Sequence, residues 1–480
     1  SRGGGPMITI DYDLTPSAPA DELQRFFSIS GEKTELLRRN WRREKGTPVF
    51  TIDGEYTTRG WTEWTQGFQY GNAIYQFDAG GEQRFLDYGR ESTVGEMAAH
   101  VSHFGVHDHG FNNVSTYGNL LRLMNEGRIP EDRWERRFYE LALKISGAVQ
   151  AARWTALPDD LGYIYTFNGP HSLFVDTMRT LRVLALGYRL GHVYMGEQDE
   201  RVSLLKRLLQ HAETTARYSV YYGTGRDSYD LRGRTVHEVI FNVNNGAYRC
   251  PSTQQGYSPF STWTRGLSWV LAGYPEQLEF IETLTDDEVA AAGFHHLPTK
   301  GAVRARFLEV ARAVADFYLE YTPTDGIPYW DTGAPGLAYL GDYLDRPADP
   351  YNDYEPVDSS AAAIGAQGLL RLGRYLSALD PAKGGDPEAG SRYTQAGLTV
   401  ARTLLGEPYL STERHHEGIL LHSVYHRPNG WDNVPRGQKV PNGESCMWGD
   451  YHMVELAVYL RRLAEGGPYL AFFNIGEEAD

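Results

Sequence analysis

The sequence is poor in cysteine, in basic residues and in long apolar runs. Two cysteines, Cys250 and Cys446, cannot form a disulfide framework, and a chain of 480 residues can stabilise its core without one. Acidic residues outnumber basic ones by 62 to 46, which gives a net charge of −16. Because nucleic acids and anionic membrane surfaces are bound through clustered Lys and Arg, neither is an expected partner.

Membrane segments are also missing from the sequence. No apolar run approaches the ~18 residues of a membrane-spanning helix. The first residues lack the apolar core of a secretory signal. We therefore expect a cytoplasmic protein.

Regular alternation of strands and helices is absent, and helical spacing dominates instead. Val303, Phe307, Val310, Val314 and Phe317 recur every three or four residues, as on one face of a helix. Similar patterns indicate helices over residues 18–30, 85–104, 115–126, 138–149, 172–190, 199–220, 262–274, 358–378, 392–405 and 453–463. Strand-like alternation is limited to residues 49–52, 164–167, 236–243 and 419–424.

About eleven helices, spaced as hairpins, predict an all-α protein. The missing strand–helix rhythm argues against a doubly wound sheet and against a β/α barrel. The predicted fold is a six-hairpin (α/α)6 toroid, a barrel of helices in a single domain. An open helical solenoid is the alternative, although such folds usually show a legible repeat and this sequence does not.

No sharp domain boundary is visible in the composition. We expect residues 1–60 to form an N-terminal extension that packs on the barrel, and residues 61–470 to form the barrel itself. Segments 276–301, 380–391 and 426–443 are interpreted as loop insertions within that one domain.

Aromatic residues make up 13% of the chain, and tyrosine is the commonest of them. Amphipathic rings are typical of concave sites that bind polar ligands with apolar faces, sugars above all. An aromatic-rich core would give the same composition, so both interpretations stay open at this point.

Three aspartates precede apolar helical patterns: Asp108, Asp176 and Asp358. Asp358 is well placed as an N-cap, because its carboxylate can accept hydrogen bonds from first-turn amides. Asp108 and Asp176 could do the same. Alternatively, two neighbouring carboxyls of which one is protonated and one ionised are suited to general acid–base catalysis.

Other polar residues stand at positions that could bind a ligand. Trp263, Arg265 and Trp269 could share one side of a helix start, where an Arg pairs with a carboxylate and rings stack on a sugar, or they could be structural. His103, His107 and His109 invite a metal site, but their spacing does not arrange three imidazoles around one ion. The pairs His295-His296 and His415-His416 are expected in solvated loops.

Several short motifs occur in order between Trp64 and Leu460. They are Trp64-Thr65-x-Gly67-Phe68, His107-Asp108-x-Gly110-Phe111, Asp176-Thr177-Met178, Gln255-Gly256-Tyr257-Ser258, Ser261-Thr262-Trp263-x-Arg265-Gly266-x-x-Trp269, Pro328-Tyr329-Trp330-Asp331, Asp358-Ser359-Ser360-Ala361-Ala362 and Trp448-Gly449-Asp450-Tyr451. Together they resemble the unsaturated glucuronyl hydrolases, family 88 of the glycoside hydrolases. That family has the six-hairpin (α/α)6 toroid, in agreement with the helical pattern.

The resemblance implies a reaction, a partner and a set of site residues. Such enzymes release a Δ4,5-unsaturated uronic acid from the non-reducing end of lyase-generated oligosaccharides, by protonating and hydrating the C4–C5 double bond. Asp176 would be the general acid and then base, with Asp108 as its charged neighbour. The implied substrate-binding residues are His107, His237, Gln255, Arg265 and an aromatic wall of Trp64, Trp263 and Trp269. The resemblance implies no metal and no organic cofactor.

The sequence departs from the family pattern close to these residues. Phe167-Asn168 stands where a Trp-Asp pair is expected, Met178-Arg179-Thr180 where an apolar run with an Asn is usual, and Leu267-Ser268 where Gln-Ala is usual. We expect these changes on the aglycone side. These departures therefore affect the prediction of the leaving sugar more than the prediction of the reaction.

Other interpretations stay open as well. A related family that acts on unsaturated rhamnogalacturonides shares the toroid and the two aspartates. A hydrolase of saturated uronides or a sugar 2-epimerase could use the same toroid, and the epimerase would need two histidines facing each other across the substrate. A non-catalytic glycan-binding homologue would show no turnover. The sequence determines neither the polysaccharide nor whether the chain forms a homo-oligomer.

Overall fold

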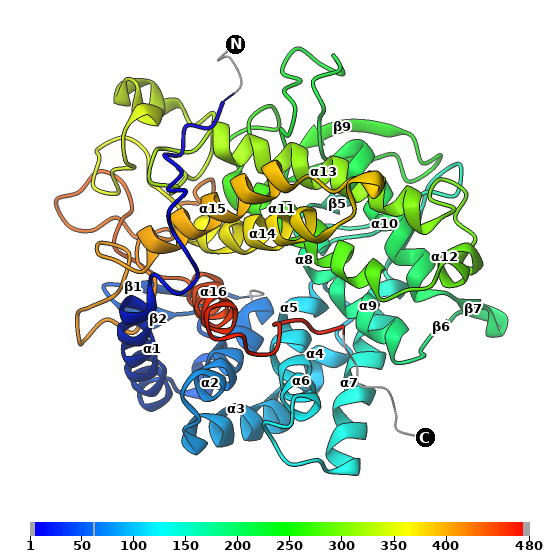
Figure 1. Cartoon of the computed structure of the whole chain (residues 1–480), viewed down its shortest axis with the longest axis horizontal. Helices are drawn as coiled ribbons and strands as arrows, with labels where there is room; N and C mark the ends of the chain where they lie inside the picture. The colour runs from blue at the N-terminus through cyan, green and yellow to red at the C-terminus, as the bar shows by residue number, and fades with distance from the viewer. Residues whose placement is uncertain (1–4, 61–62, 474–480) are drawn as a thin grey trace.

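The computed structural model describes residues 5–60 and 63–473, and its architecture is two concentric layers of helices (Figure 1). The inner layer consists of α2 (Gln66–Gly80), α5 (His109–Asn113) with α6 (Asn119–Asn125), α8 (Thr177–Thr180) with α9 (Arg182–Arg189), α11 (Thr264–Glu282), α14 (Ser359–Ala378) and α16 (Met447–Glu465). The outer layer consists of α1 (Ala20–Asn40), α3 (Gln83–Glu96), α7 (Arg133–Ala152), α10 (Leu204–Tyr218), α13 (Lys300–Glu320) and α15 (Pro387–Leu404). Two short helices, α4 (Ala98–Val101) and α12 (Asp286–Ala292), lie in connections.

Outer and inner helices alternate along the chain, so each consecutive pair forms a hairpin. The inner helices contact one another in chain order, and the ring closes because α16 packs against α2. At that closure the Tyr75 hydroxyl of α2 donates a hydrogen bond of 2.6 Å to Glu455 of α16. The predicted all-α fold, a six-hairpin (α/α)6 toroid, is confirmed.

Glycines allow the inner helices to approach one another closely. A Cβ on Gly273 of α11 would lie 2.7 Å from the backbone of Met178 in α8, and one on Gly368 of α14 would lie 2.3 Å from the Leu271 carbonyl oxygen of α11. Backbone atoms cannot yield to such contacts, so a larger residue would push the helices apart. The close α8–α11–α14 packing therefore depends on Gly273 and Gly368.

Short strands decorate the helical ring. Three two-stranded hairpins pair β1 (Phe50–Ile52) with β2 (Glu55–Thr57), β3 (Trp154–Ala156) with β4 (Gly162–Ile164), and β6 (Tyr194–Met195) with β7 (Arg201–Val202). An antiparallel sheet has the order β5 (Ser172–Phe174), β8 (Glu238–Phe241), β9 (Tyr248–Ser252). The strand predicted over 419–424 is wrong: within the described chain this segment contributes only an isolated bridge, Leu410 to Leu420, and has no neighbouring strand that would extend the pairing.

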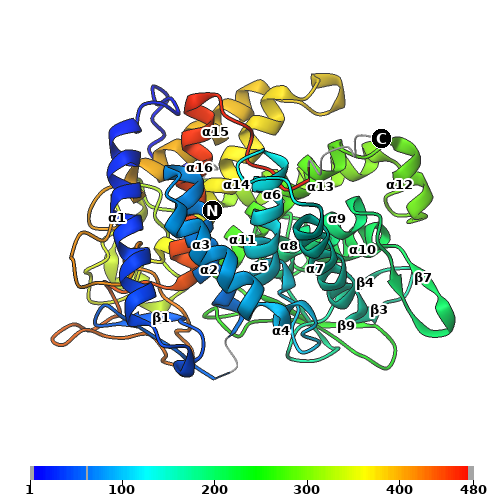
Figure 2. The same ribbon diagram turned by 90° about the horizontal axis from the view of Figure 1, so that it is seen from below.

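The N-terminal helix α1 packs on α2 and α16 as the outer member of the first hairpin. Viewed from two directions, α1 lies at one edge of the molecule, and α12 and the β6–β7 hairpin lie at the opposite edge (Figures 1 and 2). The division into an extension over 1–60 and a barrel over 61–470 stays a prediction, and residues 1–4 and 61–62 lie outside the described part.

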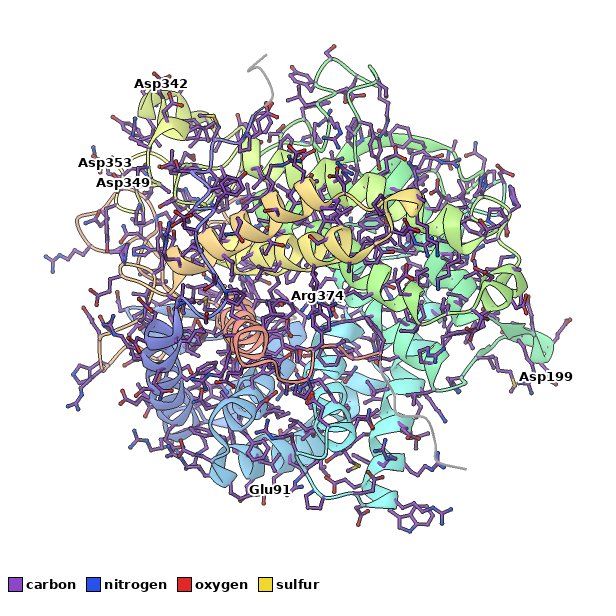
Figure 3. The ribbon with its side chains drawn as sticks, viewed as in Figure 1. Glu91, Asp199, Asp342, Asp349, Asp353 and Arg374 are labelled. Carbon is purple, nitrogen blue, oxygen red and sulfur yellow. The ribbon has the colours of Figure 1, made fainter. Side chains whose placement is uncertain are left out.

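Acidic side chains are prominent on the periphery. Glu91, Asp199, Asp342, Asp349 and Asp353 are exposed and point outward from the ring and its loops (Figure 3). Among the described residues, no helix is both long and apolar enough to cross a membrane. The predicted cap of α14 is confirmed, because the Asp358 carboxylate accepts a hydrogen bond of 3.0 Å from the Ser360 amide.

Candidate active site

A cavity of about 680 Å³ opens at the end of the ring where inner helices begin. Its lining comes from the segments just before α2, α5 and α8, and from the loops that precede α11 and α16. The lining residues are Glu63, Trp64, His103, Gly105, Val106, His107, Asp108, Phe111, Asn112, Phe167, Phe174, Asp176, His237, Gln254, Gln255, Tyr425, His426, Asn429 and Trp431. Helix N-termini carry partial positive charge, so this end of the ring favours an anionic ligand.

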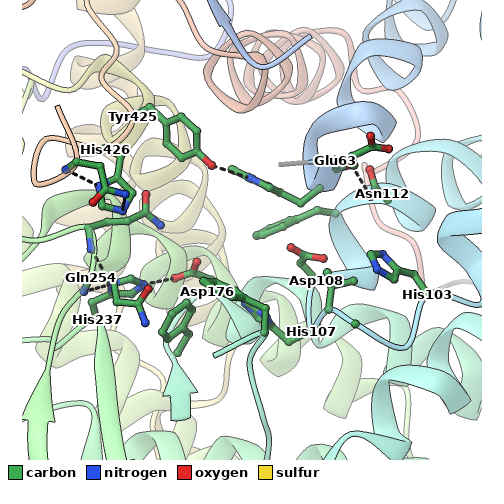
Figure 4. Close-up of a pocket in the computed structure, with 18 of the residues that line it drawn as sticks. Glu63, His103, His107, Asp108, Asn112, Asp176, His237, Gln254, Tyr425 and His426 are labelled. Atoms are coloured by element: carbon green, nitrogen blue, oxygen red, sulfur yellow. Dashed lines mark hydrogen bonds and ion pairs between the residues drawn. The ribbon is translucent and has the colours of Figure 1, made fainter. Parts of the chain in front are cut away.

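Asp108 and Asp176 face this cavity from the starts of two adjacent inner helices (Figure 4). Neither carboxylate makes a helix-capping hydrogen bond, which removes the interpretation that they are simple N-caps. The Oδ1 atom of each is buried without a hydrogen-bond partner among the described residues. Two carboxyls that the fold leaves unpaired in a cavity are available to a substrate.

Burial raises the pKa of both carboxyls to about 7. For Asp108 the negative charge of Asp176 raises the pKa further, and for Asp176 the more distant Arg265 guanidinium opposes the rise. Because the two groups repel each other when both are ionised, the loss of one proton makes the loss of the second harder. Near neutral pH the pair can therefore hold one proton and one negative charge.

The β5–β8 pairing places His237 beside Asp176. The Val175 amide donates to the His237 carbonyl oxygen at 3.1 Å, which fixes the two segments together. The Nδ1 atom of His237 accepts hydrogen bonds from the amides of Gln254 and Gln255, at 3.1 and 3.2 Å. Burial lowers the pKa of His237 well below its ordinary value. A neutral ring whose Nδ1 is an acceptor carries its proton on Nε2, which lies 3.8 Å from Asp176 Oδ1.

His107 and His237 both contact the ring of Phe174. The ring centroids of His107 and Phe174 are 5.4 Å apart, and those of His237 and Phe174 are 4.2 Å apart. Burial lowers the pKa of His107 to about 3, so this imidazole is neutral. The Nε2 atom of His237 faces a carboxylate, whereas an epimerase would need it to face a second imidazole.

Two motif glycines explain why the aspartate segments have their sequence. A Cβ on Gly110 would lie 2.2 Å from the Thr180 carbonyl oxygen of α8. A Cβ on Gly67 would lie 2.3 Å from the Asn112 carbonyl oxygen of α5. The starts of α2, α5 and α8 can meet only because both positions lack a side chain, and this contact brings Asp108 and Asp176 into one cavity.

The aromatic wall differs from the predicted one. Trp64 lines the cavity, stacks on Trp448 at 4.9 Å and donates a hydrogen bond of 3.2 Å to the Tyr425 hydroxyl. Trp263 and Trp269 are buried and do not line the cavity, which corrects their predicted placement. They begin an inner helix whose first turns are buried on all sides, so their rings pack behind the site.

Arg265 is likewise absent from the cavity lining, and only 1% of its surface is exposed. Its guanidinium donates to Asp358 at 3.2 Å and to the carbonyl oxygens of Val424 and Tyr425 at 2.7 and 2.9 Å. It also donates to the Gln255 side chain. These contacts use the guanidinium internally, so Arg265 positions Gln255 and the loop that carries Tyr425 rather than presenting itself to a ligand.

The metal interpretation of the first histidine group does not fit the structure. His109 does not line the cavity, and its two ring nitrogens are hydrogen bonded to Ser146 Oγ at 2.8 Å and to the His103 carbonyl oxygen at 2.7 Å. His109 therefore ties the Asp108 segment to α7, and its nitrogens are already occupied.

Several lining residues were missed by the sequence analysis. Tyr425, His426, Asn429 and Trp431 belong to the loop before α16, most of which was interpreted only as an insertion. Their aromatic and amide side chains are types that often bind sugars, and this was the only hint in the sequence. A loop has no periodic pattern, so the sequence could not show which of its side chains face the cavity. Gln254 also lines the cavity, but nothing in the sequence selects it in addition to Gln255.

Comparisons with known proteins find relatives that match most of the chain. No protein-family model matches the chain. The chain is 24% identical over 450 residues to an unsaturated glucuronyl hydrolase of Bacillus sp. (strain GL1), covering 92% of this chain and 97% of that protein. It is also 24% identical over 424 residues to an unsaturated chondroitin disaccharide hydrolase of Streptococcus pneumoniae, covering 86% of this chain and 85% of that protein.

Solved structures show the same fold. The crystal structure of an unsaturated glucuronyl hydrolase specific for heparin matches with a TM-score of 0.67 and 20% identity over 93% of this chain and 97% of that one. The enzyme of Bacillus sp. GL1 matches with a TM-score of 0.66 and 22% identity, over 92% of this chain and 97% of that one. The predicted resemblance to unsaturated glucuronyl hydrolases is confirmed.

Proposed function

We propose that this chain is a glycoside hydrolase that releases a Δ4,5-unsaturated uronic acid from the non-reducing end of lyase-generated oligosaccharides. The observation that carries the proposal is the pair of buried, unpaired carboxyls, Asp108 and Asp176, facing one cavity with pKa values of about 7. Such a pair supplies one acid and one anion at neutral pH without a metal or a nucleophile.

Asp176 is assigned as the acid and then the base. Its carboxyl proton is transferred to C4 of the enol ether, and the C4–C5 π electrons form the new C4–H bond, which leaves positive character at C5. A water molecule then attacks C5 and transfers its proton back to Asp176. The C5 hemiketal opens by breaking the bond from C5 to the ring oxygen, and the resulting hemiacetal at C1 expels the aglycone as an alcohol.

Asp108 and His237 assist without being consumed. The ionised Asp108 carboxylate stabilises the positive character that develops on the sugar ring. His237 is neutral and directs its Nε2–H toward Asp176, so it can donate a hydrogen bond to the carboxylate or to the attacking water. Trp64 offers an aromatic face on which a sugar ring can stack.

The uronate carboxylate must be bound by a protein of net charge −16. No Lys or Arg belongs to the cavity lining among the described residues, so attraction has to come from helix N-termini and from neutral donors such as Gln254 and Asn429. One relative is named for unsaturated chondroitin disaccharides and another for heparin, and the aglycone of this enzyme is to be identified by assay. The cytoplasmic location stays a prediction, as does any homo-oligomer.

An ultraviolet absorbance assay tests the proposal directly. The conjugated C4–C5 double bond absorbs, and its hydration abolishes that absorbance. We expect loss of absorbance with at least one disaccharide from a panel made by lyases acting on glycosaminoglycans, ulvan, gellan and pectin. Asp176→Asn should lower kcat by about 10²- to 10⁴-fold, the usual contribution of a general acid–base group.

A matched control removes a carboxylate elsewhere. Asp199→Asn lies on the exposed β6–β7 hairpin and should retain wild-type turnover (Figure 3). A flat absorbance trace for the wild-type chain across the whole panel would contradict the proposal. Full activity in Asp176→Asn would remove the assigned acid.

A further inference from the structure

Three metal-ligating side chains converge outside the cavity, on the opposite edge of the molecule from α1. His295 and His296 follow α12 within the segment predicted to be an insertion, and Asp159 lies between β3 and β4. The Nε2 atoms of His295 and His296 lie 3.1 Å from Asp159 Oδ1 and Oδ2 respectively. The pair lies in a loop as expected, with His295 exposed and His296 partly buried, and both rings also contact Asp159.

Local backbone structure directs these three side chains at one point. The Leu297 amide donates to the Phe294 carbonyl oxygen at 3.1 Å, which makes a tight turn with both histidines at its centre. Their ring centroids are 4.0 Å apart, and Phe294 is buried beneath them. On the other side, Asp159 has a φ of 62°, a left-handed conformation that only a few residue types besides glycine adopt readily.

The next residue, Asp160, shows what an ordinary ion pair looks like at this turn. Asp160 also has a left-handed φ, of 60°, and its Oδ2 lies 3.1 Å from the Lys206 ammonium, an ordinary ion pair. Asp159 faces two imidazoles instead, and an imidazole presents a lone pair to a metal only in its neutral form. Two imidazole nitrogens and one carboxylate this close together are a set of atoms that can ligate a metal. The Nε2 atom of His296 also donates a hydrogen bond of 2.9 Å to the Asp159 carbonyl oxygen, which metal binding would replace.

We propose that Asp159, His295 and His296 form a Zn²⁺ site that links the segment after α12 to the turn between β3 and β4. The three ligand atoms lie within 4.8 Å of one another, so small side-chain movements bring them to the ~2.0–2.2 Å metal distances typical of zinc. Two His and one carboxylate are a common zinc ligand set that leaves a fourth position for water.

Solvent reaches the site, because 57% of the His295 side chain and 17% of the His296 side chain are exposed. The fourth ligand is then water or a small anion. None of the three residues lines the cavity, so this site does not depend on the proposed hydrolase function. Its role is to hold the segment after α12 against the β3–β4 turn.

Zinc binding to the full chain, without an affinity tag and after removal of metals with EDTA, tests the proposal. Isothermal titration with Zn²⁺ should show one ion per chain, and Co²⁺ should give the visible spectrum of a four- or five-coordinate site. His295→Ala, His296→Ala and Asp159→Asn should each weaken zinc affinity by at least ~10-fold, the smallest loss reported even for second-sphere partners.

Two variants control for surface chemistry. His415→Ala removes one histidine of the other adjacent pair, and Asp160→Asn removes the neighbouring carboxylate of the same turn. Both should bind zinc like the wild-type chain. Zinc should also raise the Tm of the wild-type chain and of both controls, but not that of the three site variants, because a ligand stabilises only the state that binds it.

The proposal is overturned if the wild-type chain binds no stoichiometric zinc. It is overturned equally if all three site variants keep wild-type zinc affinity. In that case the histidines only donate hydrogen bonds to Asp159, and zinc would leave the Tm unchanged.

Discussion

Two buried clusters of charged residues stand on the same pair of inner helices, α8 and α9, and they handle burial in opposite ways. At the helix start, Asp176 faces Asp108 across a cavity that no Lys or Arg lines within residues 5–60 and 63–473. One turn later, Arg179 contacts both Glu276 and Glu455, and Arg182 lies 3.7 Å from Glu276. The first cluster borders open space and the second is closed in the middle of the ring.

The pKa values of the carboxyls follow from this difference in pairing. Burial raises the pKa of Asp108 and of Asp176 to about 7. Burial would raise the pKa of Glu455 too, but the Arg179 and Arg182 guanidinium groups hold it well below its usual range. Equal burial therefore leaves one carboxyl able to carry a proton and another permanently ionised. Whether a buried carboxyl is protonated depends on whether a cation is paired with it, and only the unpaired carboxyl can act as an acid.

The largest expected effect comes from breaking the paired cluster. Arg179→Met leaves Glu276 and Glu455 without their main partner in the ring interior, where an unpaired charge costs about 3–5 kcal/mol of unfolding free energy. Urea unfolding of the variant and the wild-type chain measures this. Arg38→Met removes an exposed pair with Glu35 and should cost no more than ~1 kcal/mol. Similar small losses in both variants would mean that the interior network contributes little.

A smaller effect, with the opposite sign, is expected from the unpaired cluster. Burial raises the pKa of Asp108 to about 7 in the folded chain, whereas an unfolded chain releases that proton near the ordinary value of 3.8. Stability therefore falls as pH rises from about 4 to 7 and the loss is complete above that range. Asp108→Asn should have a higher Tm than the wild-type chain at pH 8 and nearly the same Tm at pH 4.

Asp78 provides the contrasting control for that measurement. It is buried as well, but Arg122 and Arg462 hold its pKa below the ordinary value. Asp78→Asn should be destabilised at pH 8 and should approach the wild-type chain only in strong acid. The comparison fails if the two variants respond to pH in the same direction.

The smallest expected effect concerns Arg265, whose charge acts on Asp176 from behind the cavity. The charge of Arg265 lowers the pKa of Asp176, so Arg265→Gln should move the alkaline limb of kcat/KM to higher pH, by up to ~1 unit. Arg265→Lys keeps the charge and should keep the limb in place, even if it lowers kcat/KM. An unmoved limb in Arg265→Gln, or the same shift in Arg265→Lys, would contradict this role.

Substrate charge gives a second readout for the same variants. Because Arg265 does not line the cavity, Arg265→Gln should reduce kcat/KM by the same factor for a uronate substrate and for its neutral amide. A larger loss for the uronate would mean that the guanidinium reaches the carboxylate during turnover.

Much of the fold and six of the nine predicted site residues could be located from the sequence, because most motifs lie at or before the start of an inner helix. Periodicity located the helices, and hairpin spacing gave the ring. The starts of parallel inner helices must meet at one end of such a ring, which is why Trp64, His107, Asp108, Asp176 and, through a strand pairing, His237 share one cavity. Gln255 joins them from the loop before α11.

The other site residues could not be predicted because residue type does not show whether a side chain faces the cavity. Trp263, Arg265 and Trp269 have the same types as a sugar-binding set, yet the first turns of α11 are buried on every side and turn them away from the cavity. Conversely, His426, Asn429 and Trp431 reach the cavity from a loop whose path is set by tertiary contacts. The alternation over 419–424 failed for a related reason, since a strand needs a partner that the local sequence cannot supply.

The closure of the ring by α16 against α2 has a consequence for the order of events during synthesis. Trp448, the stacking partner of Trp64, belongs to the last helix of the described chain, almost four hundred residues after Trp64. Domains are made from the N-terminus onward, and contacts between distant segments form late because their loop must close first. Before α16 has emerged from the ribosome, the other five hairpins can form only an open ring. Asp108 and Asp176 are then still exposed to water. We therefore expect activity to appear only after α16 has left the ribosome and docked against α2.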